Sequence, residues 1–508
     1  MNAWKYLWVI LCCFAIPAQA DLRFLLPPVS SPAVMYAAFT PLAKYLSQSI
    51  GQTVTLRFSG NLESFYNAAE KRSAQIVLFC PIAYIRSAHQ QPYYPLAGVI
   101  PSPGGNHSVI VVRHNSPIHN ILQLRNRSFV MGDPACAASS LIPLSLFQEI
   151  GMSPKSFSAF RQSGSDQSAL MDVAARFYDA TAVAENVAEP YIRAGSLRVI
   201  AHAEVGPGDL LAASGEIPAV QRAKLTAALL SAQQRDPASI AALGALAVGF
   251  KPVSDGDYNV LRSLYKDIHG TNLAPRISDK AMTLGIPPAF TPIAAYRIFA
   301  PLQKVLSKAT GYPIHLVIPH DEAAFVADGR SGLFDFALLT PRMVPMETRT
   351  MVAIAKSVPS RHIPGLAIVY RGNMAHSFKL SSNPLTVAFA SPYCSGRIIA
   401  EKTLHRLATG HQLTWVADGS ERAVFTALAD GRATLGVVRT ATVKALEKEL
   451  PGTWSILTSA GAAPAWTLTA NRQINPAIRA QARQNVLKLP LNTMGSAGFM
   501  RFNAIANG

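Results

Sequence analysis

The feature that most constrains this sequence is an internal repeat with a spacing of about 260 residues. Two stretches, RFLLPPVSSPAVMYAAFTPLAKYLSQSIGQTVT and AMTLGIPPAFTPIAAYRIFAPLQKVLSKATGYPIH, align so that Pro32 matches Pro292 and Gly51 matches Gly311 at one constant offset. A repeat of this length contains more residues than one compact lobe usually needs. The chain is therefore predicted to fold as two similar domains in tandem.

Each copy begins with the same local pattern. A short apolar strand, 24–26 or 283–286, ends at prolines, which cannot continue the ladder of a central strand. Apolar residues at helical spacing follow, and a glycine stops that helix where a left-handed cap is favoured. A second β-rich segment, 53–58 or 314–318, comes next. A strand-helix-strand unit implies parallel strands, and hence an α/β fold in each copy.

The two copies correspond well beyond this unit. Both contain a buried strand cut by proline, a second apolar strand, a turn carrying cysteine, and a helix start. The pairs are 76–81 with 336–341, 111–115 with 369–373, 132–136 with 390–394, and 165–166 with 420–421. Agreement at so many ordered points indicates a duplication. We place the first domain at 21–270, a polar linker at 271–280 and the second domain at 281–508.

The first twenty residues predict a cleaved signal peptide. Lys5 supplies a positive charge, residues 7–16 are apolar, and Ala18 and Ala20 are the small residues that a signal peptidase needs. An uncleaved anchor is the alternative, but ten apolar residues are too few for a helix that spans a bilayer, which takes roughly 20. We expect a periplasmic protein that starts at Asp21, with no membrane span in the mature chain.

Composition and charge narrow the partners. Hydrophobic residues make up 49% and charged residues 15% of the chain, which is typical of packed domains rather than disorder. The net charge of +17 favours anionic partners. The basic residues are scattered without a cluster, so nucleic acid is not expected as a partner. Only three cysteines follow the signal peptide, which excludes a disulfide scaffold.

Four segments of the first copy carry a resemblance to a known family. They read SPAVMYAAFTPLAKYLSQSIG, CPIAY at 80–84, GDPACAASSLIP at 132–143 and GFKPVSDGDYNVLRSL at 249–264. Each copy resembles the phosphate/phosphite/phosphonate (PhnD-like) substrate-binding proteins of ABC importers, although the second copy lacks the last segment in recognisable form. The resemblance implies a class II periplasmic-binding-protein-like fold, in which each domain has two α/β lobes, a hinge and an interlobe cleft.

The turn from Asp133 to Ser139 is the first candidate for ligand binding. Backbone N–H groups at a helix N-terminus favour an anion. The resemblance places here a run of hydroxyl residues that binds phosphonyl oxygens, but this sequence has Cys136, Ala137 and Ala138 before Ser139. We therefore expect a small anionic solute, phosphonate-like or another oxyanion. The alternative is that Asp133 only caps a helix.

The cysteines form a second group of candidates. Cys394 occupies in the second copy the position of Cys136, and it is followed by Ser395 and by Arg397. Cys80 ends a strand whose counterpart in relatives lines the cleft. Three interpretations remain open: a disulfide, a site for a soft metal or a thiol-reactive ligand, and small buried residues.

Three further residues complete the predicted site. By resemblance, Tyr84 and Ser165 face the cleft, the alternatives being a core tyrosine and a helix N-cap. In relatives an acid binds the amino group of the ligand, and here Ala184 and Arg439 take its place in the two copies. An aminophosphonate is therefore not expected, whereas Arg397 and Arg439 suit a plain anion in the second cleft.

The sequence contains no catalytic, nucleotide or zinc motif, so neither an enzyme nor a resident cofactor is expected. The leading hypothesis is a solute-binding protein that serves an ABC permease. The alternative is a sensory or accessory module that signals to a membrane partner. A thiol-based enzyme that uses Cys136 is a third hypothesis, and it lacks an evident histidine partner.

Overall fold

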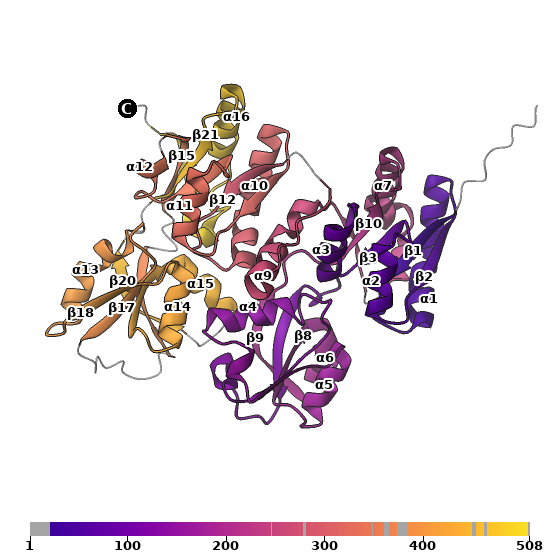
Figure 1. The fold of residues 1–508 in the computed structure, drawn as a ribbon, viewed down its shortest axis with the longest axis horizontal. Helices are drawn as coiled ribbons and strands as arrows, with labels where there is room; N and C mark the ends of the chain where they lie inside the picture. The colour runs from indigo at the N-terminus through magenta and orange to yellow at the C-terminus, as the bar shows by residue number, and fades with distance from the viewer. Residues whose placement is uncertain are drawn as a thin grey trace, which may run out of the picture.

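The computed structural model describes residues 21–244, 246–277, 281–347, 349–359, 365–372, 384–393, 395–449, 454–461 and 465–505. The predicted signal peptide, the end of the predicted linker and Cys394 lie outside the described residues. Four mixed α/β lobes are visible, two for each half of the chain (Figure 1). No helix within these ranges is long and apolar enough to cross a membrane.

One six-stranded sheet forms the first lobe of each domain. In the first domain its order is β11 (Gly249–Lys251), β4 (Tyr93–Ile100), β10 (Leu210–Ser214), β3 (Ile76–Phe79), β1 (Leu22–Leu26) and β2 (Val54–Phe58). In the second domain the order is β22 (Phe499–Asn503), β15 (Met351–Pro359), β21 (Thr467–Asn471), β14 (Phe336–Leu339), β12 (Met282–Gly285) and β13 (Ile314–Val317). The strands from the repeated strand-helix-strand unit pair in parallel, as predicted.

One five-stranded sheet forms the second lobe of each domain. In the first domain the order is β7 (Ala159–Gln162), β6 (Ser128–Met131), β8 (Ala180–Ala184), β5 (His107–Arg113) and β9 (Leu197–Glu204). In the second domain the order is β18 (Leu413–Ala417), β17 (Leu385–Phe389), β19 (Leu435–Arg439), β16 (Leu366–Arg371) and β20 (Trp454–Gly461). Both sheets therefore repeat strand for strand, and the predicted duplication and two-lobed fold are confirmed. Strand β22 takes the place of β11, although the closing motif of the first copy is unrecognisable in the second.

The first long helix of each domain shows why the repeat persists. Helices α1 (Pro32–Ile50) and α10 (Pro292–Thr310) both start with proline behind a capping hydroxyl, which accepts a backbone N–H. Both end at a glycine, Gly51 or Gly311, with φ of 71° and 74°. Only glycine adopts this left-handed conformation without strain, so the same helix length is encoded twice.

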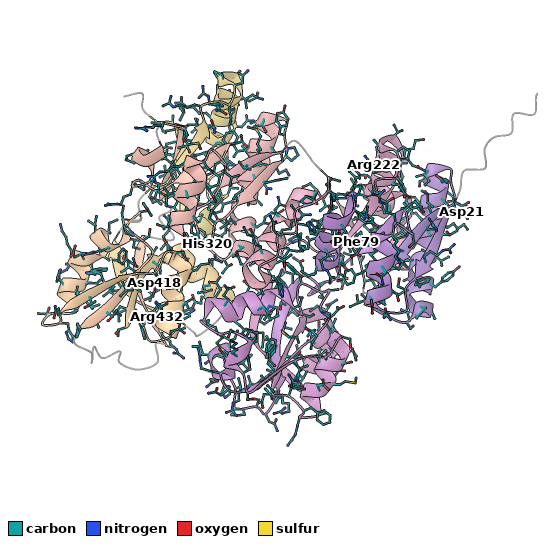
Figure 2. The ribbon with its side chains drawn as sticks, viewed as in Figure 1. Asp21, Phe79, Arg222, His320, Asp418 and Arg432 are labelled. Atoms are coloured by element: carbon teal, nitrogen blue, oxygen red, sulfur yellow. The ribbon has the colours of Figure 1, made fainter. Side chains whose placement is uncertain are left out.

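The remaining helices cover the sheets. In the first domain they are α2 (Leu62–Glu70), α3 (Pro81–Gln90), α4 (Leu141–Glu149), α5 (Asp166–Ala174), α6 (Glu185–Arg193), α7 (Ala219–Arg235), α8 (Pro237–Ala241) and α9 (Asn259–His269). In the second they are α11 (Glu322–Arg330), α12 (Val344–Glu347), α13 (Gly396–Leu407), α14 (Glu421–Ala429), α15 (Thr440–Glu449) and α16 (Pro476–Leu487). Aromatic side chains fill the cores. Phe79, which is labelled in Figure 2, packs against Phe65, Tyr84 and Tyr93.

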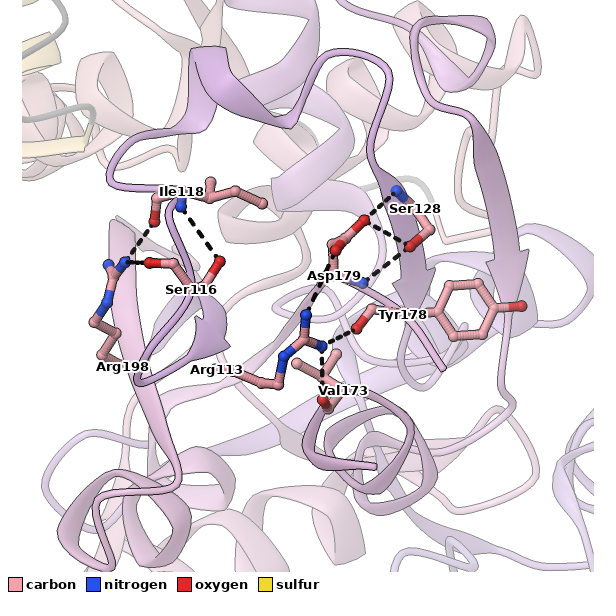
Figure 3. Close-up of polar contacts among 8 residues, drawn as sticks. All are labelled: Arg113, Ser116, Ile118, Ser128, Val173, Tyr178, Asp179 and Arg198. Carbon is pink, nitrogen blue, oxygen red and sulfur yellow. Dashed lines mark hydrogen bonds and ion pairs between the residues drawn. The ribbon is translucent and has the colours of Figure 1, made fainter. Parts of the chain in front are cut away.

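A polar network holds the second lobe of the first domain rigid (Figure 3). The Arg113 guanidinium on β5 donates to the carbonyls of Val173 and Tyr178, at 3.2 and 2.8 Å, and lies 3.5 Å from Asp179. Asp179 in turn accepts from the backbone and hydroxyl of Ser128, at 3.0 and 2.9 Å. These contacts fix the starts of β6 and β8, so the residues that follow the far ends of the two strands are held in place.

The two domains share an interface. Helix α4 of the first domain lies against α14 of the second, where the Arg422 guanidinium is 3.0 Å from the Glu149 carboxylate. The Thr426 hydroxyl donates to the Glu149 carbonyl at 3.2 Å. One continuous core cluster includes Phe147 of α4 and Phe425 of α14. The second domain is thus packed on the second lobe of the first.

Candidate functional site

A cleft of about 710 Å³ lies between the two lobes of the first domain. The first lobe contributes Cys80 at the start of α3 and Asp209 just before β10. The second lobe contributes Asp133, Asp166 and Ala184, which follow β6, begin α5 and end β8. Because the cleft is bounded by both sheets, a ligand held in it would contact both lobes. We call it the first cleft.

Three aspartates are the principal charged groups of the first cleft. The Asp133 backbone N–H donates to the Asp166 carboxylate at 2.8 Å, and the Ala184 N–H donates to its other oxygen at 3.5 Å. The Asp133 carboxylate accepts the Ala135 N–H at 2.8 Å, which tightens the turn after β6. Asp133 therefore caps this turn and not α4, whose N-cap residue is Ser140.

The carboxyl groups resist ionisation because they are withdrawn from water and near one another. Burial raises the pKa of Asp133 to about 6. Burial, reinforced by the charge of Asp133, raises the pKa of Asp209 to about 7. Burial also raises the pKa of Asp166. Among the described residues that line the first cleft there is no lysine, arginine or histidine, and Glu63 adds a fourth carboxylate.

The two cysteines of the first domain line the same cleft as free thiols. Burial raises the pKa of both Cys80 and Cys136, and the nearby aspartate charges raise it further. This direction is opposite to the lowering expected for a thiol at a helix N-terminus, because burial disfavours the thiolate and the neighbouring charges are negative. Both groups are therefore neutral at physiological pH, which disfavours a nucleophilic or redox role.

The other predicted site residues of the first domain have different surroundings. Ser165 lines the cleft, and its hydroxyl caps α5 by accepting the Ser168 N–H at 3.1 Å. Ser139 is fully buried behind the turn. Tyr84 lies in the core, where its hydroxyl donates to Asp255 at 2.6 Å and burial raises its pKa. The structure thus brings Cys80, Asp133, Cys136 and Ser165 together at one surface.

The equivalent space in the second domain, the second cleft, has a volume of only about 20 Å³. Arg439 fills it: its guanidinium carbon lies 4.6 Å from the ring centre of Trp466 and 5.5 Å from that of Phe499. The Arg439 N–H donates to the Glu421 carboxylate at 3.1 Å, and the positive guanidinium opposes the rise that burial causes in the pKa of Glu421. Arg439 is 4% exposed, so its guanidinium is enclosed by residues of its own domain.

The other residues predicted for the second domain lie around this filled space. Ser395 lines the small cavity. Arg397 is exposed, and its guanidinium lies over the Trp415 ring at 5.3 Å. Cys394 lies outside the described residues. Arg397 and Arg439 are therefore directed to aromatic rings of the protein in this structure.

Two important residues of the first cleft are absent from the predicted site. Asp166 opens the same predicted helix as Ser165, at a point where relatives often place a polar ligand contact, but only Ser165 was assigned to the site. Asp209 follows a Gly-Pro-Gly turn directly before β10, a position at which a strand edge meets the cleft. Its counterpart before β21 is Trp466, so alignment of the copies would have exposed this difference.

Two-lobed α/β domains with a ligand-sized cleft between the lobes define the class of bilobal binding proteins. The model of the ABC transporter phosphonate periplasmic substrate-binding protein family matches this chain twice, over residues 24–258 and 284–506. The chain belongs to this family and contains its domain in tandem. The proteins of this family are periplasmic substrate-binding components of ABC transporters.

Three solved structures are similar to all or part of this chain. PhnD1 from Prochlorococcus marinus in complex with methylphosphonate is 18% identical with a TM-score of 0.44, covering 49% of this chain and 99% of that one. XAC2383 from Xanthomonas citri bound to ATP is 15% identical with a TM-score of 0.43, covering 50% and 98%. The BvgS periplasmic domain from B. pertussis is 13% identical with a TM-score of 0.32, covering 94% and 89%.

Proposed function

We propose that this protein captures one small solute per chain, in the first cleft, and presents it to an ABC permease. The observation that carries the proposal is the difference in free space between the two copies: about 710 Å³ in the first cleft and about 20 Å³ in the second. Ligand pockets for small molecules commonly occupy about 300–1,000 Å³. The first copy therefore acts as the receptor, and the second copy supports it.

Ligand binding in the first cleft would be coupled to closure of the two lobes. Residues from both lobes line it, with Cys80 and Asp209 on one side and Asp133 and Asp166 on the other. A solute that contacts both sides stabilises the closed arrangement relative to the open one. The permease would recognise that arrangement. The phosphonate-like or other anionic solute expected from the sequence remains a prediction, and the lining residues supply no cationic side chain for it.

A thermal-shift screen tests the receptor function. The panel contains methylphosphonate, phosphate, sulfate, alkylsulfonates, amino acids, alkylamines and guanidines. A ligand at 100 times its Kd stabilises the native state by about 2.7 kcal/mol, and solution scattering should show a smaller radius of gyration with the same compound. Substitution Ala184→Trp should block the first cleft and abolish both effects, whereas Arg397→Ala in the second domain should change neither. Absence of any hit across the panel would contradict the receptor function.

The interdomain contact favours sensing as a second candidate function. Helix α4 begins eight residues after Asp133 and ends at Glu149, which contacts Arg422 of α14. Motion of the ligand-binding turn would therefore displace the second domain, which could pass the ligand state to a membrane partner. Pull-down from membranes with and without ligand separates the two functions, because a sensor partner should be captured through the second domain and should survive deletion of the permease gene.

A further inference from the structure

The second domain contains its own cation at the position that corresponds to the open part of the first cleft. Arg439 ends β19, and the Glu421 carboxylate at the start of α14 accepts its backbone N–H at 3.1 Å. The guanidinium lies over Trp466 and Phe499 in a space where Glu421 and Glu322 are both buried. The positive charge of Arg439 is the one that offsets the burial of Glu421. In this copy, the guanidinium of Arg439 fills the space between the lobes.

The first domain has the same backbone and the same acid, but it lacks this cation. Asp166 at the start of α5 corresponds to Glu421, and Ala184 at the end of β8 corresponds to Arg439. The backbone contact is also repeated, because the Ala184 N–H lies 3.5 Å from the Asp166 carboxylate. A methyl group thus stands where the second copy has a guanidinium. The volume that Arg439 fills in the second domain is part of the open cleft in the first.

The charges around this space are negative on every side. Asp133 and Asp166 face it from the second lobe, Asp209 faces it from the first, and Glu63 lies at the start of α2. The neutral thiols Cys80 and Cys136 complete the titratable lining. Arg86, which is outside the lining, lies over the Tyr66 ring at 4.2 Å. His107 is also outside the lining, and its imidazole Nδ1 lies 3.0 Å from the Glu185 carboxylate.

Asp209 provides the second, independent observation. Among the described residues its carboxylate has no hydrogen-bond donor, and the like charge of Asp133 on the opposite lobe adds to the effect of burial on its pKa. A desolvated carboxylate without a donor is unfavourable unless a ligand supplies one. Closure of the two lobes onto an anion would bring a further negative charge against these groups. Closure onto a cation would relieve their repulsion.

We propose that the first cleft binds a small organic cation, whose ammonium or guanidinium group contacts Asp166 and Asp209 in the space that Arg439 occupies in the second domain. This inference rests on the proposed receptor function and names the class of its solute. Apolar lining residues such as Val29, Val99 and Leu246 suit the hydrocarbon part of such a molecule. A bare metal ion fits poorly, because no group of three or more ligating side chains converges among the described residues.

Calorimetry on the full-length mature protein tests the inference. Agmatine and putrescine are the cationic probes, and methylphosphonate and sulfate are the anionic ones, each titrated at pH 5 and pH 8. We expect the cations to bind at least tenfold more tightly at pH 8, because deprotonated carboxylates favour them and Asp133 and Asp209 ionise within this interval. Titration at pH 6.5 in buffers of different ionisation enthalpy should show that cation binding releases protons.

Matched variants locate the cation. Asp166→Asn and Asp209→Asn should each weaken cation binding at least tenfold, whereas Glu63→Gln, which removes an exposed carboxylate at the edge of the lining, should change it less than threefold. Ala184→Arg introduces the internal cation of the second copy, and it should abolish binding while raising the melting temperature. If Ala184→Arg fails to fold, Ala184→Lys takes its place, because lysine carries the same charge on a smaller head group.

The outcomes separate the two proposals. Cation binding that depends on Asp166 and Asp209 supports both. Binding of the anions in the first cleft, blocked by Ala184→Trp and without affinity for the cations, overturns the cation inference and leaves the receptor function intact. Binding of a cation that is unchanged in both aspartate variants also overturns it. If no compound of either charge binds, the receptor function itself is contradicted.

Discussion

The two clefts share strand order, helix caps and one backbone contact, yet one is open and the other is filled. The difference depends on a few side chains at equivalent positions: Ala184 against Arg439, and Asp209 against Trp466. In the second domain the arginine and the tryptophan form a stacked pair that occupies the ligand space. A duplicated binding domain can therefore change from receptor to scaffold without any change of fold, because the fold positions the site and the side chains decide its contents.

The strongest test of this comparison is removal of the internal cation. Arg439→Met keeps most of the volume but leaves the buried Glu421 without the nearby positive charge. We expect the second domain to lose about 2–4 kcal/mol of its free energy of unfolding, measured by denaturant titration at pH 7. The double variant Arg439→Met with Glu421→Gln should recover much of this loss. Equal instability of the single and double variants would show that Arg439 acts through packing alone.

The next largest effect concerns the contact between the domains. Arg422→Met removes the partner of Glu149, whose side chain is 8% exposed. We expect destabilisation of about 2–3 kcal/mol, together with separation of one thermal transition into two. The exposed pair Arg193 and Glu189, 3.4 Å apart on the first domain, offers a control: Arg193→Met should cost less than about 1 kcal/mol. A single transition that persists in Arg422→Met would argue against domain coupling through α4.

The acidity of the first cleft predicts a pH-dependent stability through Asp209. A raised folded-state pKa for Asp209, about 7, means that the folded protein binds this proton more tightly than the unfolded chain. Stability from this group is therefore highest in acid and falls as the pH rises toward 7. Asp209→Asn should increase the free energy of unfolding at pH 8 by about 1–3 kcal/mol and leave it unchanged at pH 4.

Another aspartate of the first domain serves as the control for Asp209→Asn. Asp172 on α5 is only partly buried, and Asp172→Asn should change stability by less than about 0.5 kcal/mol at either pH. Chemical unfolding at pH 4 and pH 8 measures both variants. A gain for Asp209→Asn that is equal at the two pH values would mean that its charge is not the cause.

The smallest expected effect concerns the thiols. Because burial and the aspartates raise the pKa of Cys80 and Cys136, alkylation of the folded protein at pH 8 should be slower than that of the urea-unfolded chain by at least tenfold. The measurement uses a Cys394→Ser background and mass spectrometry. Cys80→Ser and Cys136→Ser should retain ligand binding within about threefold. Rapid alkylation of either folded thiol would revive the hypothesis of a reactive cysteine.

Much of the fold was predictable from the sequence because the repeat imposes strong local constraints. Pro32 and Gly51, with their counterparts Pro292 and Gly311, set the same helix length in both copies. The turn at Asp133 with Cys136, and Cys80 at the end of a strand, were candidates for the cleft of the first domain, and the structure places Cys80, Asp133 and Cys136 along it. Tyr84 could not be placed in the same way, because its hydroxyl partner Asp255 lies 171 residues away in sequence.

By itself the sequence determined the tandem architecture, because proline, glycine and apolar periodicity act on neighbouring residues and leave a readable pattern. Only the tertiary structure decided the character of the two clefts. The net charge of +17 pointed to an anion, yet the first cleft gathers Asp133, Asp166 and Asp209 from three separate segments. Arg439, expected to receive a ligand, is stacked on Trp466 and enclosed. Electrostatics and packing depend on distances in space, and sequence spacing does not report these.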